Sequence, residues 1–258
     1  MSSESEQVVG TGERPGPLWS VPVTSEPRRV SISEALGWFD GGADILIGNW
    51  WVLIASVLLV MVLHLWILVF PLTGALFTAL SAPVFYAGML SILHSSCDKK
   101  GPDTSLLRLL DGISHRCLSL LAQPVLRMVA LVIGVILVAG LDELLGLNSL
   151  SSWGMRQSSW TTYFAGGVLV FVIAAINLSF FFYVPMTFLA DKTIRGSLAS
   201  SMRACRVNFL PLLAYQAMAT LLMFLGALFV GVGMLYSIPM IVAANYAAFR
   251  QVFMQRGA

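Results

Sequence analysis

The stretch WWVLIASVLLVMVLHLWILVF, residues 50–70, decides the class of fold. It carries no acidic side chain, no lysine and no arginine, and its one ionisable residue is His64. A helix must run for about 20 predominantly apolar residues to cross the roughly 30 Å hydrocarbon core of a bilayer. We therefore expect residues 50–70 to form a transmembrane helix.

Similar apolar runs follow along the chain. They predict five further transmembrane helices, at residues 72–93, 125–145, 163–189, 209–230 and 232–249. The last two belong to one apolar stretch that would measure about 62 Å as a single helix. Two crossings with a reversal at Gly231–Gly233 explain that length, because glycine tolerates turn geometry. The predicted fold is an all-α polytopic membrane bundle of about six transmembrane helices.

The composition agrees with this class. Hydrophobic residues make up 57% of the chain and charged residues 11%, against a soluble norm of roughly 45–50% and about 25%. The mean hydropathy is +0.83. Residues 1–27 are rich in Ser, Glu, Gly and Pro, a composition typical of disorder. The sequence therefore predicts a disordered cytosolic tail, residues 1–27, and a membrane domain, residues 28–258.

Basic residues predict the orientation, because they are enriched in cytosolic loops. With both termini in the cytosol, only Arg156 falls on the outer side. The other fourteen lie on the cytosolic side: Arg14, Arg28, Arg29, Lys99, Lys100, Arg108, Arg116, Arg127, Lys192, Arg195, Arg203, Arg206, Arg250 and Arg256.

Three polar segments with helical periodicity each precede a membrane hairpin, at residues 31–49, 104–123 and 193–208. We expect them to form amphipathic helices in the headgroup plane on the cytosolic side. The returning helix of each hairpin carries a proline, Pro83, Pro185 or Pro239, which predicts three kinks. The pattern indicates a threefold internal repeat, although membrane helices are rich in proline in any case.

Four polar residues interrupt the apolar runs: His64, Asn177, Gln216 and Asn245. They could line a polar pathway or binding site, or they could make separate hydrogen bonds between helices. The second interpretation is favoured, because no Asp, Glu, Lys or Arg is predicted at the membrane centre beside them. Placement around one cavity would favour transport, whereas separate dry contacts would exclude it.

Basic residues cluster in the third polar segment, at Lys192, Arg195, Arg203 and Arg206. Because membrane helices flank them, they indicate contact with anionic lipid headgroups rather than with nucleic acid.

Two pairs, His94/Cys97 and His115/Cys117, have the composition of a zinc site. However, His115 and Cys117 would lie about 200° apart on a helix, so no metal site is predicted. No catalytic motif is visible, and we expect neither an enzyme nor a cofactor.

The segments ADK at residues 190–192 and SLASSMRACRVNF at residues 197–209 resemble a bacterial pattern in which an amphipathic stretch precedes a glycine-turned hairpin. The pieces RRV (28–30), GWF (37–39) and NWW (49–51) resemble its entry segment. The pattern is that of the uncharacterised YciC-like six-helix proteins and of the membrane domain appended to some glycerophosphodiester phosphodiesterases. The resemblance implies a bacterial inner-membrane location and supplies no catalytic residue.

The sequence therefore favours a non-enzymatic membrane protein: a scaffold, assembly or accessory factor that contacts anionic lipids and a membrane protein partner. The alternative is a small transporter or channel for a lipid or an apolar solute.

Overall fold

The computed structural model describes residues 21–24, 26–97, 106–145, 160–228 and 232–254. Within these ranges the chain is helical and contains no strand, so the all-α prediction is confirmed. The helices are α1 (Ile32–Leu36), α2 (Trp38–Ile47), α3 (Trp50–His64), α4 (Trp66–Val69), α5 (Pro71–Cys97), η1 (Leu106–Leu110), α6 (Asp111–Ser114), α7 (Cys117–Leu144), α8 (Trp160–Ser179), α9 (Tyr183–Phe188), α10 (Ile194–Val207), α11 (Phe209–Leu228) and α12 (Met234–Phe253).

Five helical stretches in the described ranges are long and apolar enough to cross a membrane, which makes this a multi-pass membrane protein. They are Trp50–Val69 (α3 with α4), Pro71–Cys97, Cys117–Leu144, Trp160–Phe188 and Phe209–Leu228. The sixth predicted span is the helix α12, which is 20 residues long but less apolar. Asn245, Arg250 and Gln251 interrupt it, and its large side chains, such as Tyr246 and Phe249, are buried in the core.

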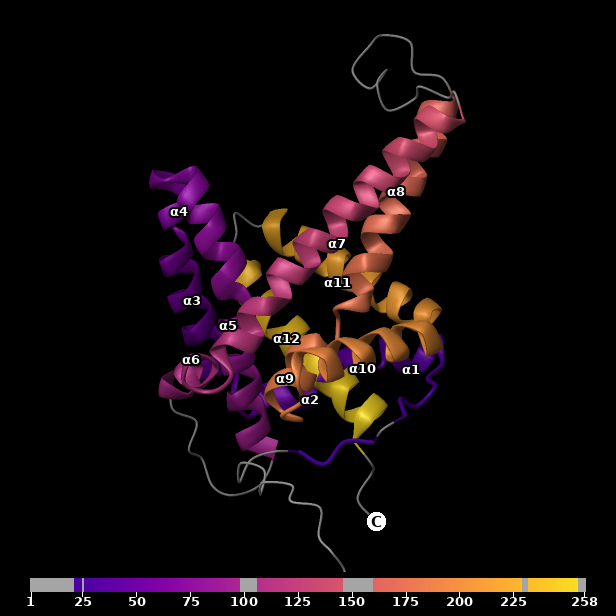
Figure 1. Ribbon diagram of the computed structural model, residues 1–258. Coiled ribbons are helices and arrows are strands. Elements are labelled where there is room, and N and C mark those ends of the chain that lie inside the picture. Colours follow the sequence, from indigo (N-terminus) through magenta and orange to yellow (C-terminus); the bar gives the residue numbers. More distant parts are fainter. Residues whose placement is uncertain (1–20, 25, 98–105, 146–159, 229–231, 255–258) are drawn as a thin grey trace, which may run out of the picture.

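The three predicted amphipathic segments are helical, as α1 with α2, η1 with α6, and α10. They gather at one end of the bundle, below the long helices in Figure 1, and we call this the amphipathic end. Local chemistry starts two of them. Ser31 and Glu34 form a capping box at α1, and the Thr193 hydroxyl accepts from Gly196 N at α10.

Each amphipathic segment packs on the proline-bearing helix of a different hairpin. The helix α2 packs on α12, where a Cβ added to Gly42 would lie 2.6 Å from Ala244 N. The segment η1–α6 packs on α5, with Gly88 against Leu109 and Gly112 against Val84.

The third segment, α10, packs on α9, and its Ser201 hydroxyl accepts from Phe182 N at 3.0 Å. The first segment thus rests on the third hairpin, the second on the first, and the third on the second. The three contacts close a ring at the amphipathic end, as expected of a threefold repeat.

An extended segment ahead of α1, residues 21–24 and 26–30, packs on the amphipathic end, and we call it the strap. Val21 N donates to Leu189 O and Thr24 N to Phe253 O. The buried Asn208 side chain accepts from Val30 N at 2.8 Å and donates to Arg28 O at 2.9 Å. Residue 21 therefore already packs on the bundle, ahead of the predicted boundary at residue 28. The earlier part of the predicted tail and the predicted turn residue Gly231 lie outside the described residues.

Candidate functional site

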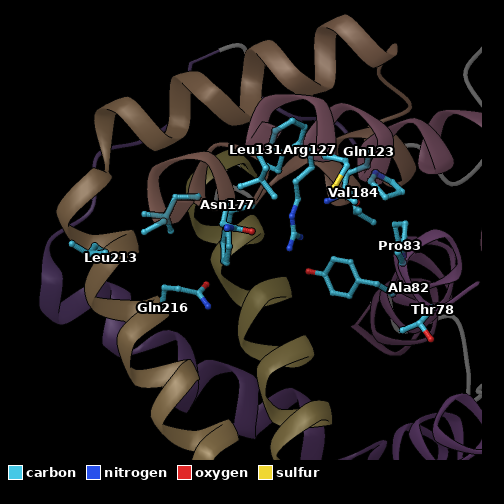
Figure 2. Close-up of a pocket in the computed structure, with 18 residues that line it drawn as sticks. Thr78, Ala82, Pro83, Gln123, Arg127, Leu131, Asn177, Val184, Leu213 and Gln216 are labelled. Atoms are coloured by element: carbon cyan, nitrogen blue, oxygen red, sulfur yellow. The ribbon is translucent and has the colours of Figure 1, made fainter. Parts of the chain in front are cut away.

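A partly enclosed cavity of about 830 Å³ lies between α5, α7, α8, α9 and α11. Its walls are largely apolar, from residues such as Met128, Leu131, Val184 and Leu213. Polar side chains interrupt this lining from four helices, namely Thr78, Tyr86, Gln123, Arg127, Asn177 and Gln216. Figure 2 shows the polar ends of Arg127, Asn177 and Gln216 directed toward one common space.

Arg127 is the charged residue of this lining, and its placement corrects the sequence analysis. We expected it on the cytosolic side, at the start of a helix at residues 125–145, but α7 already begins at Cys117. Arg127 therefore lies about 15 Å into the helix at 1.5 Å per residue. Arg127 thus shares a cavity with two of the predicted intramembrane polar residues, Asn177 and Gln216, which the sequence analysis did not foresee.

The Arg127 guanidinium lacks an anionic partner in the described part of the chain. No hydrogen bond or ion pair joins it to another described residue. Arginine stays protonated in proteins and offers five N–H donors. A charge in a membrane-spanning helix is costly unless a partner or water meets it. The cavity therefore presents an unpaired cation to whatever enters it.

Two of the four predicted intramembrane polar residues share this cavity. Asn177 uses its Nδ2 to donate to Ile173 O at 2.7 Å, which leaves its side-chain oxygen as an acceptor. Gln216 lies opposite on α11. Both amides can hydrogen-bond a polar ligand, because each carries a donor and an acceptor.

The other two lie outside the lining and are hydrogen-bonded within the bundle. His64 Nδ1 contacts Val60 O at 2.6 Å, and its Nε2 contacts the Ser81 hydroxyl at 3.2 Å. Asn245 accepts from the Tyr215 hydroxyl at 2.7 Å. For these two residues the interpretation as hydrogen bonds between or within helices holds, so the predicted group of four is split.

The basic residues of α10 form a separate surface at the amphipathic end. Arg195, Arg203 and Arg206 are exposed and lie near one face of the helix. Lys192 donates to the Ser200 hydroxyl at 2.9 Å, and partial burial, with a smaller effect of Arg203, lowers its pKa. None of the four lines the cavity.

Two of the three predicted proline kinks lie inside helices. Pro83 is within α5, where it lines the cavity, and Pro239 is within α12. Pro185 lies in the first turn of α9, and the chain turns just ahead of it at residues 180–182, next to the Phe181 carbonyl to which Pro185 has no N–H to donate. Sequence analysis overlooked Pro124, which lies inside α7 beside the cavity.

The two His/Cys pairs do not come together as one set of metal ligands. His94 Nδ1 contacts the Tyr246 hydroxyl at 2.9 Å. In the described ranges, no three His, Cys, Asp or Glu side chains come close enough together to hold a metal ion.

These features define a class: a multi-pass α-helical membrane protein with a cavity that is apolar in its walls and cationic at one point. Residues 42–256 match the family described as a domain of unknown function, DUF7847, and the chain belongs to that family. No curated protein matches the chain, and no solved structure matches it.

Proposed function

We propose that this protein is a non-enzymatic integral membrane protein that binds an anionic lipid in the cavity. The observation that carries the proposal is the unpaired Arg127 guanidinium within a membrane-spanning helix. A phosphodiester or carboxylate headgroup would neutralise it, since charge-assisted hydrogen bonds to arginine are among the strongest. Water alone would leave the charge beside apolar walls.

The rest of the lining suits an amphipathic ligand. The amides of Gln123, Asn177 and Gln216 can bond headgroup oxygens and hydroxyls. Met128 and Leu131 follow Arg127 along α7 and offer apolar contact to the acyl chains. Burial of apolar surface contributes about 25 cal/mol per Å². The cavity thus combines one charged contact with apolar walls, as expected for a lipid rather than a soluble ion.

Orientation and location belong to the same proposal. The amphipathic end faces the cytosol and both termini are cytoplasmic, because basic residues favour that side. The basic face of α10 then meets anionic headgroups of the inner leaflet. The YciC-like resemblance supports a bacterial inner membrane. With this orientation the cavity opens near the cytosolic leaflet. The proposed role of the protein is to carry or present a lipid.

A second candidate function is a scaffold or assembly factor for a membrane protein partner. It is favoured by the outward face of α7 and α8, where large apolar side chains such as Ile136, Leu137 and Phe164 are exposed. Bilayer lipid can cover such a face as well as a protein partner can, so the exposed face does not favour a scaffold. We therefore prefer lipid binding, which the unpaired Arg127 supports.

The test compares Arg127→Gln with Arg195→Gln, which removes the same charge from the exposed face of α10. Each protein is placed in nanodiscs of phosphatidylcholine with phosphatidylglycerol, and the retained lipid is counted by native mass spectrometry. Loss of a charged hydrogen bond costs about 1.5–3 kcal/mol, which is roughly a 10- to 100-fold weaker affinity. We expect that loss for Arg127→Gln and a smaller one for Arg195→Gln, because Arg203 and Arg206 share the surface headgroup contacts of α10. Equal retention by wild type and Arg127→Gln would contradict the proposal.

A further inference from the structure

The hairpin that carries Arg127 and Asn177 stands apart from the rest of the bundle. Residues 125–144 of α7 and 160–179 of α8 extend away from the other long helices in Figure 1, and we call them the arm. Most of the α7 side chains in the arm face outward. The buried ones lie between the two helices, as where Gly134 meets Ile176 and Val172. The arm is therefore held together chiefly by its own two helices.

Both legs of the arm have a weak point next to the cavity. Pro124 lies inside α7 and has no N–H for the carbonyl of Leu120, a feature that bends helices. In the other leg α8 ends at Ser179 and α9 begins at Tyr183. Phe180 N and Phe181 N bond only three residues back, to Asn177 O and Leu178 O. Pro124, Phe180 and Phe181 all line the cavity, so the two weak points flank it.

On the side of these weak points away from the arm, hydrogen bonds and an ion pair hold the base of α7 in place. Arg116 Nε donates to Asp191 Oδ1 at 2.7 Å, and the Arg116 guanidinium also donates to Asp191 O at 3.1 Å. Both residues have positive φ, 62° and 51°, so each holds a left-handed conformation that is costly without such support. The Tyr183 hydroxyl donates to Ser119 O at 2.9 Å. The base of α7 is thus joined to α9 and to the start of α10.

We propose that the arm pivots at Pro124 and at residues 180–182 and thereby opens and closes the cavity. This rests on the proposed function, since it names the movement that admits the lipid. Arg127 and Asn177 lie on the arm close to the pivots. Tyr86 on α5 and Gln216 on α11 lie in the rest of the bundle, which we call the body. A lipid that contacts the arm residues and the body residues together draws the arm toward the body.

The experiment measures distances by double electron–electron resonance in the full chain, with Cys97, Cys117 and Cys205 replaced by alanine. One pair of spin labels joins arm to body, at the exposed positions Leu137 and Leu72. The control pair lies within the body, at Leu72 and Leu225. Leu137 is 13 residues beyond Pro124, about 20 Å along the helix. A rotation of about 20° would therefore move it by roughly 7 Å.

In phosphatidylcholine nanodiscs we expect a broad arm–body distribution that narrows and shifts by several ångströms when phosphatidylglycerol is included. The control pair stays narrow in both lipids. If the arm–body distance distribution were as narrow as that of the control pair and unchanged by lipid, the proposed pivoting of the arm (the hinge) would be refuted. If Arg127-dependent lipid retention persisted in that case, the proposed function would stand without the hinge. A broad arm–body distribution that does not change when phosphatidylglycerol is added would refute the link between arm movement and lipid binding in the cavity.

Discussion

The ring at the amphipathic end predicts that Gly42→Ala destabilises the protein. An alanine Cβ at this position would lie 2.6 Å from Ala244 N and 2.8 Å from Ala244 Cα, which are backbone atoms. Ordinary contact needs about 3.5 Å, so α2 and α12 must separate by up to about 1 Å. Overpacking costs about 1–3 kcal/mol, and a clash with backbone atoms lies toward the upper end, about 2–3 kcal/mol. The better helix propensity of alanine returns about 1 kcal/mol. The net loss is about 1–2 kcal/mol.

The neighbouring Gly41 supplies a matched control in the same helix. Its added Cβ would meet Ala247 Cβ at 3.5 Å, an ordinary contact. Gly41→Ala should therefore leave stability unchanged or raise it by up to about 1 kcal/mol.

Thermal unfolding in detergent can be followed by labelling of the buried Cys205 with a thiol-reactive dye, after replacement of Cys97 and Cys117. One kcal/mol corresponds to about 2–4 °C in a chain of this size. We expect Gly42→Ala to lower Tm by roughly 2–8 °C and Gly41→Ala not to lower it. Equal Tm values for the two variants would refute the reasoning, because they would show that α2 does not approach α12 closely.

Two further changes test the hydrogen bonds of the strap and of the base of α7. Asn208→Ala removes both hydrogen bonds that hold the strap, at Val30 N and Arg28 O. It should cost about 2 kcal/mol and speed proteolysis of the strap, and an unchanged cleavage rate would contradict this role. Tyr183→Phe removes the hydroxyl that donates to Ser119 O. It should lower stability by about 1 kcal/mol and broaden the arm–body distances, whereas unchanged distances would show that this bond does not hold the base of α7.

Run length made the membrane spans predictable. Residues 50–70 and 209–228 are long, predominantly apolar stretches, and both form long helices. The amphipathic segments were also predictable, since apolar side chains recur every three or four residues. Which hairpin each segment packs on could not be read from the sequence. That choice depends on contacts such as Gly42 with Ala244, which are about 200 residues apart.

The site was only half predictable, for a local reason. Gln123 and Pro124 interrupt the apolar run ahead of residue 125, and proline usually marks a helix boundary. The helix instead runs through Pro124 from Cys117, which carries Arg127 into the span. A warning was present in the sequence: Cys117–Gln123 continues the helical periodicity up to the proline. Asn245 lies outside the cavity lining, because it accepts from Tyr215, a partner on another helix that the sequence does not reveal.

The central claim is that an anionic lipid occupies the cavity against Arg127. The most direct measurement is photo-crosslinking with phosphatidylglycerol that carries a photoreactive headgroup, followed by peptide mapping. The proposal predicts labels within residues 123–131 and 213–216, competed by unlabelled phosphatidylglycerol and lost in Arg127→Gln. Labels confined to α10, or spread evenly along the outer face of α7 and α8 and unaffected by Arg127→Gln, would contradict it.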